Sequence, residues 1–231
     1  MWNEGDLNDE QIAAINEPNN VFLVACPGSG KTRTLTYKIA FELSGLEDPK
    51  KWIVAITYTH RAADEIRERI EILGVDTSQL WIGTIHAFCL EWILKPYGLY
   101  HDKLKNGFKI VNSYDSEEII SQICSSIRTG NIRYGECSHF YTPRGITLTC
   151  AGSKIPLVRQ VLDKYHSHLA ENDQIDFEQI LYFSHEILSS NPSIAKILAN
   201  LFSYVLVDEY QDTKEVQYSI VASIIKASQG R

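Results

Sequence analysis

A short glycine-containing segment near the N-terminus carries residue types that bind phosphate. It reads Ala25-Cys-Pro-Gly-Ser-Gly-Lys-Thr32 and joins an apolar run to a helix-like stretch. Its glycines, Gly28 and Gly30, let the backbone bend so that N–H groups converge on phosphate oxygens, and the helix that follows points its positive end at the same anion. Lys31 supplies a charge for the β- and γ-phosphates, and the Thr32 hydroxyl is a ligand for magnesium.

This segment predicts binding of ATP together with Mg²⁺. We expect contacts with the nucleotide from the loop and the first helical turn, namely Pro27, Gly28, Ser29, Gly30, Lys31, Thr32 and Arg33. Ala25 stands where the general pattern has its first glycine, so a glycine-rich turn with an incidental lysine is the alternative interpretation. The apolar run before the loop and the helix-like stretch after it favour the nucleotide site.

An acidic pair ends a second apolar run, which reads Tyr204-Val-Leu-Val-Asp-Glu209. In proteins with a phosphate-binding loop, the first acid of such a pair holds magnesium, usually through water, and the second orients and deprotonates the attacking water. Asp208 and Glu209 match these roles in that order. Without the phosphate-binding segment, the pair would be interpreted as a solvated turn. With that segment, it predicts a site for ATP hydrolysis.

Apolar runs and helix-like stretches alternate around these segments. Continuous apolar runs predict buried strands at Val21–Ala25, Ile53–Thr57, Leu80–Gly83 and Tyr204–Val207. Periodic apolar residues predict helices from Asn8 or Asp9 to Asn16, and at Lys31–Leu43, Arg61–Leu73, His86–Leu94 and Val216–Ile225. Strands that alternate with helices in this way indicate an α/β fold, in which helices flank both faces of a parallel sheet.

The middle of the chain has a different pattern. From about Tyr100 to Asp176 it contains helix-like stretches at Ser116–Ser126 and Leu157–Ala170, and no clear buried strand. We therefore expect a mostly helical subdomain at residues 100–176, inserted into a discontinuous core that consists of residues 1–99 and 177–231.

The composition is typical of a globular protein without a membrane segment. Apolar residues make up 44% of the chain and charged residues 22%, and no apolar run approaches the roughly 20 residues that span a bilayer. The five cysteines are far apart and include no Cys-x-x-Cys pair. This spacing argues against a disulfide framework or a zinc site and favours a cytoplasmic location.

The charge distribution leaves binding to nucleic acid open. The formal net charge of −7 argues mildly against it. One stretch is nevertheless basic, with Arg128, Arg133, Arg144, Lys154 and Arg159 against the single acid Glu136. Such a stretch is either a surface for a phosphate backbone or an ordinary solvated face.

Five segments together resemble the UvrD/Rep-like helicases of superfamily one. They are Leu7-Asn8 with Gln11, Ala25–Thr32, Thr57–Ala63, Gly83–Phe88 and Asp208–Thr213, in the family's order and at about its spacing, and Asp176-Phe177 before Ile180-Leu181 is a further, weaker match. The phosphate-binding segment of this family also lacks the first glycine. The resemblance implies a RecA-like P-loop NTPase core with a helical insertion. It also implies ATP-driven translocation on single-stranded DNA, typically from 3′ to 5′.

The resemblance implies roles for individual residues. Gln11 would read adenine. Lys31, Glu209 and Gln211 would act in catalysis, and Gln211 would also couple the nucleotide to the DNA. Contacts with DNA are implied for Thr57, Tyr58, Thr59, Arg61, Thr84 and His86, and the ring of Tyr58 would stack on a base. A half-buried Tyr58 ring at a strand end and a hydrogen-bonded structural His86 are the alternatives.

Two positions depart from the family pattern. Cys26 stands where the family often has glycine, which restricts the backbone there. His60-Arg61 stands where Asn-Lys is common, which leaves the detailed DNA contacts of this segment open.

The family's further motifs, a glutamine-containing switch and arginines on a second RecA-like domain, have no counterpart in residues 214–231. We therefore expect the N-terminal half of a longer protein, or half of a motor that another chain completes.

The expected partners are single-stranded DNA or DNA with a single-stranded tail, and the second RecA-like domain. A nuclease is a further option, and no membrane is expected. An ATP-switched module that binds DNA or a nuclease without unwinding is the alternative function. A phosphate-loop kinase of small metabolites would leave the segments at Thr57 and Gly83 unexplained.

Overall fold

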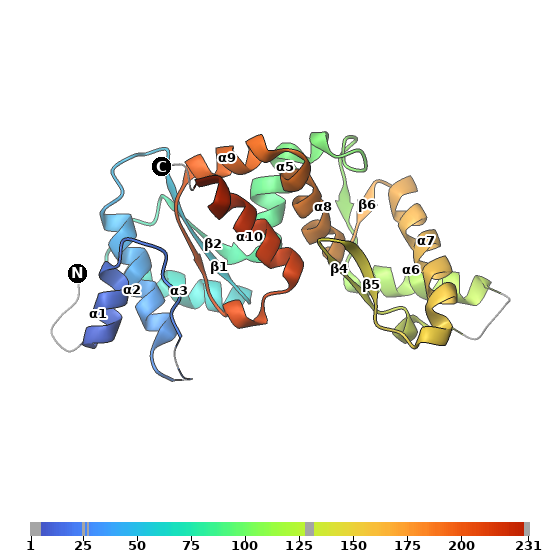
Figure 1. Cartoon of the computed structure of the whole chain (residues 1–231), viewed down its shortest axis with the longest axis horizontal. Helices are drawn as coiled ribbons and strands as arrows, with labels where there is room; N and C mark the ends of the chain where they lie inside the picture. Colours follow the sequence, from blue (N-terminus) through green and yellow to red (C-terminus); the bar gives the residue numbers. More distant parts are fainter. Residues whose placement is uncertain (1–5, 25, 27, 128–131, 229–231) are drawn as a thin grey trace. The chain divides into compact units, whose positions relative to one another are not determined.

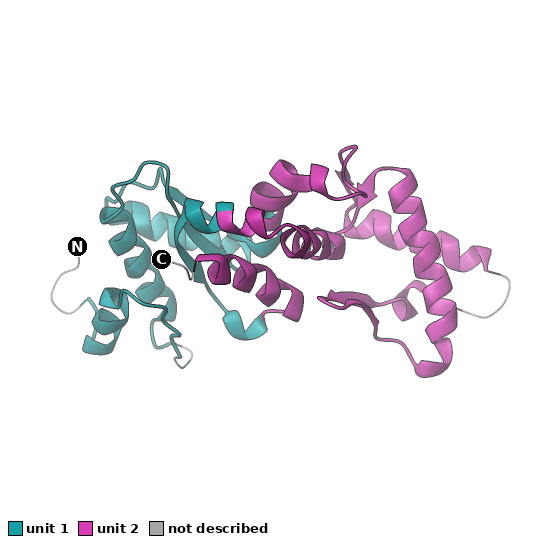
Figure 2. Cartoon of the chain, turned by 45° about the horizontal axis from the view of Figure 1, so that its top comes forward, with its two compact units in different colours: residues 1–88, 197–212 teal, residues 89–196, 213–231 magenta. Residues whose placement is uncertain are grey.

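The computed structural model describes residues 6–24, 26, 28–127 and 132–228. Ala25, Pro27 and Arg128, which the sequence analysis considered, lie outside the described residues. Figure 1 shows the helices and strands along the chain. The chain divides into two compact units (Figure 2), one of residues 1–88 and 197–212 and the other of residues 89–196 and 213–231. The predicted division into residues 1–99 with 177–231 and residues 100–176 stays a prediction.

Three parallel strands make up the sheet of the first unit. In spatial order they are β2 (Leu80–Thr84), β1 (Trp52–Thr57) and β7 (Phe202–Val207). The central strand β1 is buried from Ile53 to Thr57, as expected for a continuous apolar run that is covered on both faces. The register places Thr57 beside Thr84 and Ile56 beside Val207. The carboxyl ends of the three strands therefore lie along one edge of the sheet.

Two helices, α2 (Lys31–Ser44) and α3 (His60–Ile72), pack against this sheet, and α1 (Asp9–Asn16) packs against α2. The structure confirms the predictions of all three helices to within one residue at each end. Side chains from α2, α3 and the three strands form one core cluster of Ile39, Leu43, Ile53, Ala55, Ala63, Ile66, Ile70, Ile82 and Leu206. The buried Lys38 of α2 is neutralised by Glu42 at 2.8 Å and donates to the carbonyl groups of Ile15 and Glu17, which joins α1 to α2.

The apolar run that begins at Val21 does not form the predicted strand. No strand is assigned to Val21–Val24, and Phe22 and Val24 are 72% and 81% exposed. The ring of Phe22 contacts Tyr210 edge-to-face, with 5.7 Å between the ring centroids. The prediction of a buried strand here is wrong because an apolar run records side-chain preference only. A strand also needs a neighbouring backbone to pair with. Among the described residues no strand pairs with Val21–Val24, and β7 pairs with β1 alone.

The predicted helix at His86–Leu94 has two parts. The α-helix α4 (Ile85–Phe88) follows β2 directly, and Cys89–Leu94 continues as a π-helix before α5 (Lys95–Tyr97). The spacing of apolar residues distinguishes helix from strand but does not distinguish these two kinds of helix.

Helices dominate the second unit. They include α6 (Ser113–Ser126), α7 (Ile155–Glu171), α8 (Phe177–Ser190) and α10 (Glu215–Ser228), and α9 (Pro192–Leu201) runs across the sequence boundary between the units. Two short strand pairs were not predicted: the parallel pair β3 (Lys109–Ile110) with β6 (Gln174–Ile175), and the hairpin of β4 (His139–Thr142) with β5 (Gly145–Leu148). Strands of two to four residues are too short to produce a periodic signal. In the part of the chain that is described, no helix is long and apolar enough to cross a membrane.

Candidate functional site

The phosphate-binding segment turns sharply before α2. The Ser29 N–H group donates to the carbonyl oxygen of Cys26 at 3.1 Å, and the Ser29 hydroxyl donates to the same oxygen at 2.6 Å. Gly28 and Gly30 have φ angles of +80° and +89°, which residues with a side chain rarely adopt. Gly30 is the N-cap of α2 and offers no side-chain acceptor to the first N–H groups of the helix. These groups can bind an anion.

Gln11 connects α1 to this segment. It forms a capping box with Asn8, in which the Gln11 N–H donates to the Asn8 side chain at 2.8 Å and the Asn8 N–H donates to Oε1 of Gln11 at 3.0 Å. The side-chain amide nitrogen of Gln11 donates to the Ser29 carbonyl at 3.1 Å. A Cβ atom on Gly30 would approach this nitrogen to 2.8 Å, so a larger residue there would displace the Gln11 amide. The residue predicted to read adenine thus lies against the phosphate-binding segment.

The acidic pair lies at the end of β7, beside the same segment. The Asp208 N–H donates to the carbonyl of Ile56 at 2.8 Å and so extends the pairing of β7 with β1 by one residue. Glu209 leaves the strand with a φ of +51°. Its carboxylate lies 3.9 Å from Nζ of Lys31, and it accepts a hydrogen bond from Gln211. The three residues predicted to act in catalysis therefore lie together.

The electrostatics of Asp208 favour a nearby cation. Burial raises the pKa of its carboxyl group, and the negative charge of Glu209 acts in the same direction. The hydrogen bond from the Glu209 N–H and the charge of Lys31 oppose this effect without reversing it. The carboxylate of Asp208 is thus not fully compensated by its surroundings.

Asp208 and Thr32 fit the requirements of a magnesium ion. Mg²⁺ prefers hard oxygen ligands and keeps several waters. A carboxylate and a hydroxyl supply such oxygens, and the raised pKa of Asp208 shows that its charge lacks full compensation. Thr32 is in the first turn of α2, on the helix that begins at the phosphate-binding segment.

The segments predicted to contact DNA lie at the carboxyl ends of β1 and β2. The ring of Tyr58 is 67% exposed. The Thr57 side chain is buried and its hydroxyl donates to the Thr59 carbonyl at 2.9 Å, so any contact of Thr57 with DNA would use its backbone. Thr59 caps α3 by accepting from the Ala62 N–H at 3.1 Å. On the neighbouring strand, the Thr84 hydroxyl accepts from the Ala87 N–H at 3.3 Å.

The two remaining predicted DNA contacts lie on the helices that follow these strands. Arg61 is exposed in the first turn of α3, and His86 is partly buried on α4. The half-buried alternative for Tyr58 is wrong, because its ring is mostly exposed.

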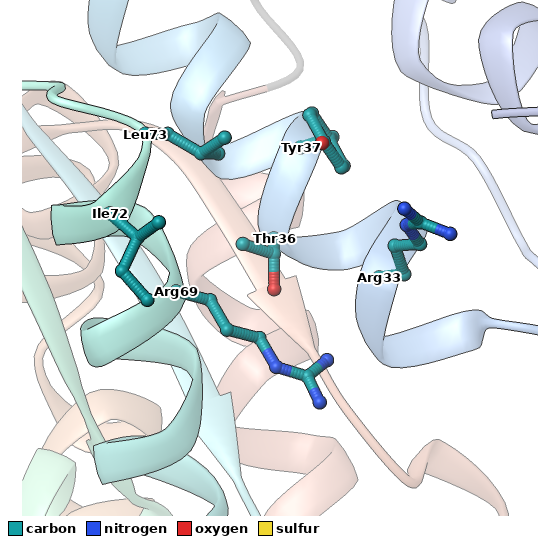
Figure 3. Close-up of a pocket in the computed structure, with 6 residues that line it drawn as sticks. All are labelled: Arg33, Thr36, Tyr37, Arg69, Ile72 and Leu73. Carbon is teal, nitrogen blue, oxygen red and sulfur yellow. The ribbon is translucent and has the colours of Figure 1, made fainter. Parts of the chain in front are cut away.

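A hollow of about 380 Å³ lies between α2 and α3 (Figure 3). Its lining residues are Arg33, Thr36, Tyr37, Arg69, Ile72 and Leu73. The sequence analysis named only Arg33. Tyr37 could have been found, because it follows Arg33 by four residues and so shares its face of the helix. Arg69 reaches the hollow from α3 (Figure 3), which no local pattern indicates.

Comparison with known proteins shows the family of this chain. A family model described as the UvrD/REP helicase N-terminal domain matches residues 7–230. This chain belongs to that family.

Curated relatives of this UvrD/REP chain are named as helicases. The chain is 31% identical to a probable DNA helicase II homolog of Mycoplasma capricolum, over 93% of this chain and 32% of the relative. It is 28% identical to the ATP-dependent DNA helicase PcrA of Staphylococcus epidermidis, over 94% of this chain and 31% of the relative. The PcrA of Staphylococcus aureus is 26% identical over 93% of this chain and 31% of the relative. The chain therefore spans about a third of the length of these relatives.

The five segments that resemble the UvrD/REP family all lie in the first unit, apart from Thr213 at the end of the last segment. The weaker match at Asp176-Phe177 lies in the second unit. There Asp176 caps α8 by accepting from the Gln179 N–H at 2.9 Å, which is a structural role.

Proposed function

We propose that this chain is the ATP-binding and ATP-hydrolysing unit of a DNA helicase that translocates along single-stranded DNA from 3′ to 5′. The observation that carries the proposal is the approach of Lys31 to Glu209 at 3.9 Å, beside a loop whose glycines have positive φ angles. That arrangement combines a phosphate-binding lysine with a carboxylate that can act on water. A second RecA-like domain, in the same protein or in a partner chain, completes the motor.

The nucleotide is proposed to lie along the start of α2. Its phosphates contact the segment from Pro27 to Lys31, and its base lies toward Gln11 and Arg33, where the hollow between α2 and α3 offers space. Thr32 and Asp208 hold magnesium, which when bound neutralises part of the triphosphate charge. Glu209 orients and deprotonates water, and Gln211 links Glu209 to the DNA segments.

The DNA strand is proposed to cross the edge where β1 and β2 end. Ligands gather at the carboxyl ends of parallel strands, and the register of Thr57 beside Thr84 gives both DNA segments the same edge. The exposed ring of Tyr58 offers a stacking surface for one base. A cytoplasmic location is part of this proposal, and a nuclease partner stays a prediction.

Lys31→Ala tests the nucleotide site. We expect this variant to lose most of its affinity for ATP with magnesium. We expect it to keep its fold, because the Lys31 side chain is about a third exposed and alanine favours the helix that begins there. The matched control is Lys50→Ala, which removes an exposed lysine between α2 and β1. Titration with a fluorescent ATP analogue and circular dichroism measure the two properties. Equal affinity in Lys31→Ala and in the parent would refute the site.

A further inference from the structure

Two histidines and an aspartate converge in the second unit, and none of them has a role in the proposed motor. His139 begins β4, His166 lies in α7 and Asp176 precedes α8. One potential ligand atom from each residue lies within 4.8 Å of the other two, and the two imidazole rings are 5.8 Å apart between centroids. The three residues are separated by 27 and 10 positions in the sequence (166 − 139 and 176 − 166), so only the tertiary fold groups them.

His139 presents an unused ring nitrogen to this cluster. Its Nδ1 lies 3.1 Å from the carbonyl oxygen of Cys137. A carbonyl can only accept, so Nδ1 carries the proton and Nε2 carries a lone pair. This Nε2 is shielded from solvent and has no hydrogen-bond partner among the described residues. A histidine whose other nitrogen is fixed by a backbone carbonyl has the usual arrangement of a metal ligand.

His166 presents its ring to the same cluster from α7, the helix at residues 155–171. Its Nε2 lies 3.2 Å from the hydroxyl of Tyr141, which adds an oxygen next to the cluster.

Asp176 brings a buried carboxylate to the same cluster. Its carboxylate accepts from the Gln179 N–H at 2.9 Å and from the Tyr165 hydroxyl at 3.0 Å. Each carboxylate oxygen has two lone pairs, so both can still bind a cation. Within the described ranges, no Lys or Arg forms an ion pair with it. A bound cation would compensate the charge of such a carboxylate.

We propose that His139, His166 and Asp176 bind one divalent transition-metal ion, with zinc as the best match. Two neutral imidazoles and a carboxylate suit zinc, and a water or the Tyr141 hydroxyl completes four ligands. Ligand atoms around tetrahedral zinc are about 3.4 Å apart at bond lengths near 2.1 Å. The ligand atoms of the cluster lie within 4.8 Å of one another, so their separations need to shrink by up to about 1.4 Å. The ion would tie the β4–β5 hairpin to α7 and to the start of α8. The cysteine spacing that argued against zinc does not bear on this histidine site.

Metal binding by the full chain tests the proposal. The chain is produced without a histidine tag, treated with a chelator, and titrated with Zn²⁺ against a chromogenic competitor and separately with Co²⁺. We expect one Zn²⁺ ion per chain at the histidine site, visible Co²⁺ absorption typical of tetrahedral nitrogen and oxygen ligands, and a higher unfolding midpoint with Zn²⁺. Asp176→Asn retains the bond to the Gln179 N–H while removing the charge, and should weaken Zn²⁺ binding at least about tenfold.

His139→Ala and His166→Ala should weaken Zn²⁺ binding at least as strongly. His168→Ala is the matched control, because His168 is exposed on α7 two residues from His166, and its affinity should equal that of the parent. Unchanged affinity in the three site variants, or no uptake at micromolar Zn²⁺, would overturn the proposal. A sulfur-to-cobalt band in the parent would also overturn it, since it would assign the ion to Cys124 and Cys137, whose sulfurs lie 3.8 Å apart. That spectrum decides the matter even if a variant fails to fold.

Discussion

Lys31 and Glu209 are distant in the sequence and still approach to 3.9 Å. In the ligand-free chain the Glu209 carboxylate therefore interacts with Lys31 and accepts from Gln211. In the proposed function, a bound triphosphate competes for Lys31, because phosphate is the stronger anion at the helix N-terminus. Glu209 then loses its cation and becomes a better base for water. The same residues thus couple nucleotide binding to the chemistry.

Glu209→Gln separates binding from hydrolysis. In the complete motor we expect this variant to bind ATP and to turn it over about 10²-fold more slowly or worse, the scale of general-base catalysis. The amide has nearly the shape of the carboxylate but cannot take a proton. Phosphate release measured beside ATP affinity tests this, with the exposed Glu215→Gln as the control. Turnover at the parent rate would remove Glu209 from the chemistry.

Asp208→Asn should stabilise the ligand-free chain while it removes a magnesium ligand. Burial raises the pKa of Asp208 in the folded state, so its ionised form is less favourable there than in the unfolded chain. This cost is absent below the unfolded pKa of about 3.9. It develops as pH rises toward the higher folded pKa, and is complete above that value.

The measurement for Asp208→Asn is the thermal midpoint at two pH values. At pH 7 we expect a gain in the free energy of unfolding of about 0.5–2 kcal/mol, the usual range for single stabilising changes. Near pH 4 the gain should shrink. Asp163→Asn, at an exposed position on α7, is the control. A lower midpoint at pH 7 would contradict the electrostatic argument.

At the scale of elements, two strand-to-helix junctions shape the proposed DNA edge. Thr59 caps α3 immediately after β1, and Thr84 binds the Ala87 N–H at the start of α4 immediately after β2. Both hydroxyls accept hydrogen bonds from backbone N–H groups of the following helix, and these bonds mark where each strand ends. Tyr58 lies between the end of β1 and the cap of α3, and its ring is exposed there.

Tyr58→Ala tests that edge. In the complete motor we expect single-stranded DNA affinity to fall by about 1–3 kcal/mol, the contribution of one stacked base. Tyr58→Phe is the matched control, because it keeps the ring and should bind nearly as well as the parent. Fluorescence anisotropy with a labelled oligonucleotide measures both variants. Equal affinities for the alanine and phenylalanine variants would exclude stacking.

At the scale of the whole molecule, the chain supplies one nucleotide-binding unit and spans about a third of its relatives. The residues proposed to contact phosphate, magnesium and water all come from the first unit. In the proposed motor, arginines of a second RecA-like domain stabilise charge on the transferring phosphoryl group, which is worth about 10³–10⁵ in rate. Translocation also needs two domains that close on ATP and open after hydrolysis.

The chain by itself should therefore bind ATP weakly, hydrolyse it very slowly and leave duplex DNA intact. A strand-separation assay with ATP and magnesium, run beside a phosphate-release assay, measures both activities. A complete helicase of the same family serves as the positive control. Robust unwinding by this chain at low concentration would show that it needs no second domain.

The sequence by itself determined the local features of this protein. The phosphate-binding segment, the acidic pair and the bounds of α1, α2 and α3 follow from residues that are close in the chain. Capping and glycine conformation are local, as the Asn8–Gln11 box and the φ angles of Gly28 and Gly30 show. Family resemblance extended these features to the order of motifs, and with it to the parallel α/β core.

Only the tertiary structure decided which distant residues meet. The approach of Lys31 to Glu209 depends on β7 lying beside β1, and the shared edge of Tyr58 and Thr84 depends on the register of β1 with β2. The run from Val21 shows the limit most clearly, since its composition predicted a strand that no described neighbour pairs with. Side-chain chemistry is encoded residue by residue, whereas strand pairing and clusters such as His139 with His166 are properties of the backbone arrangement in space.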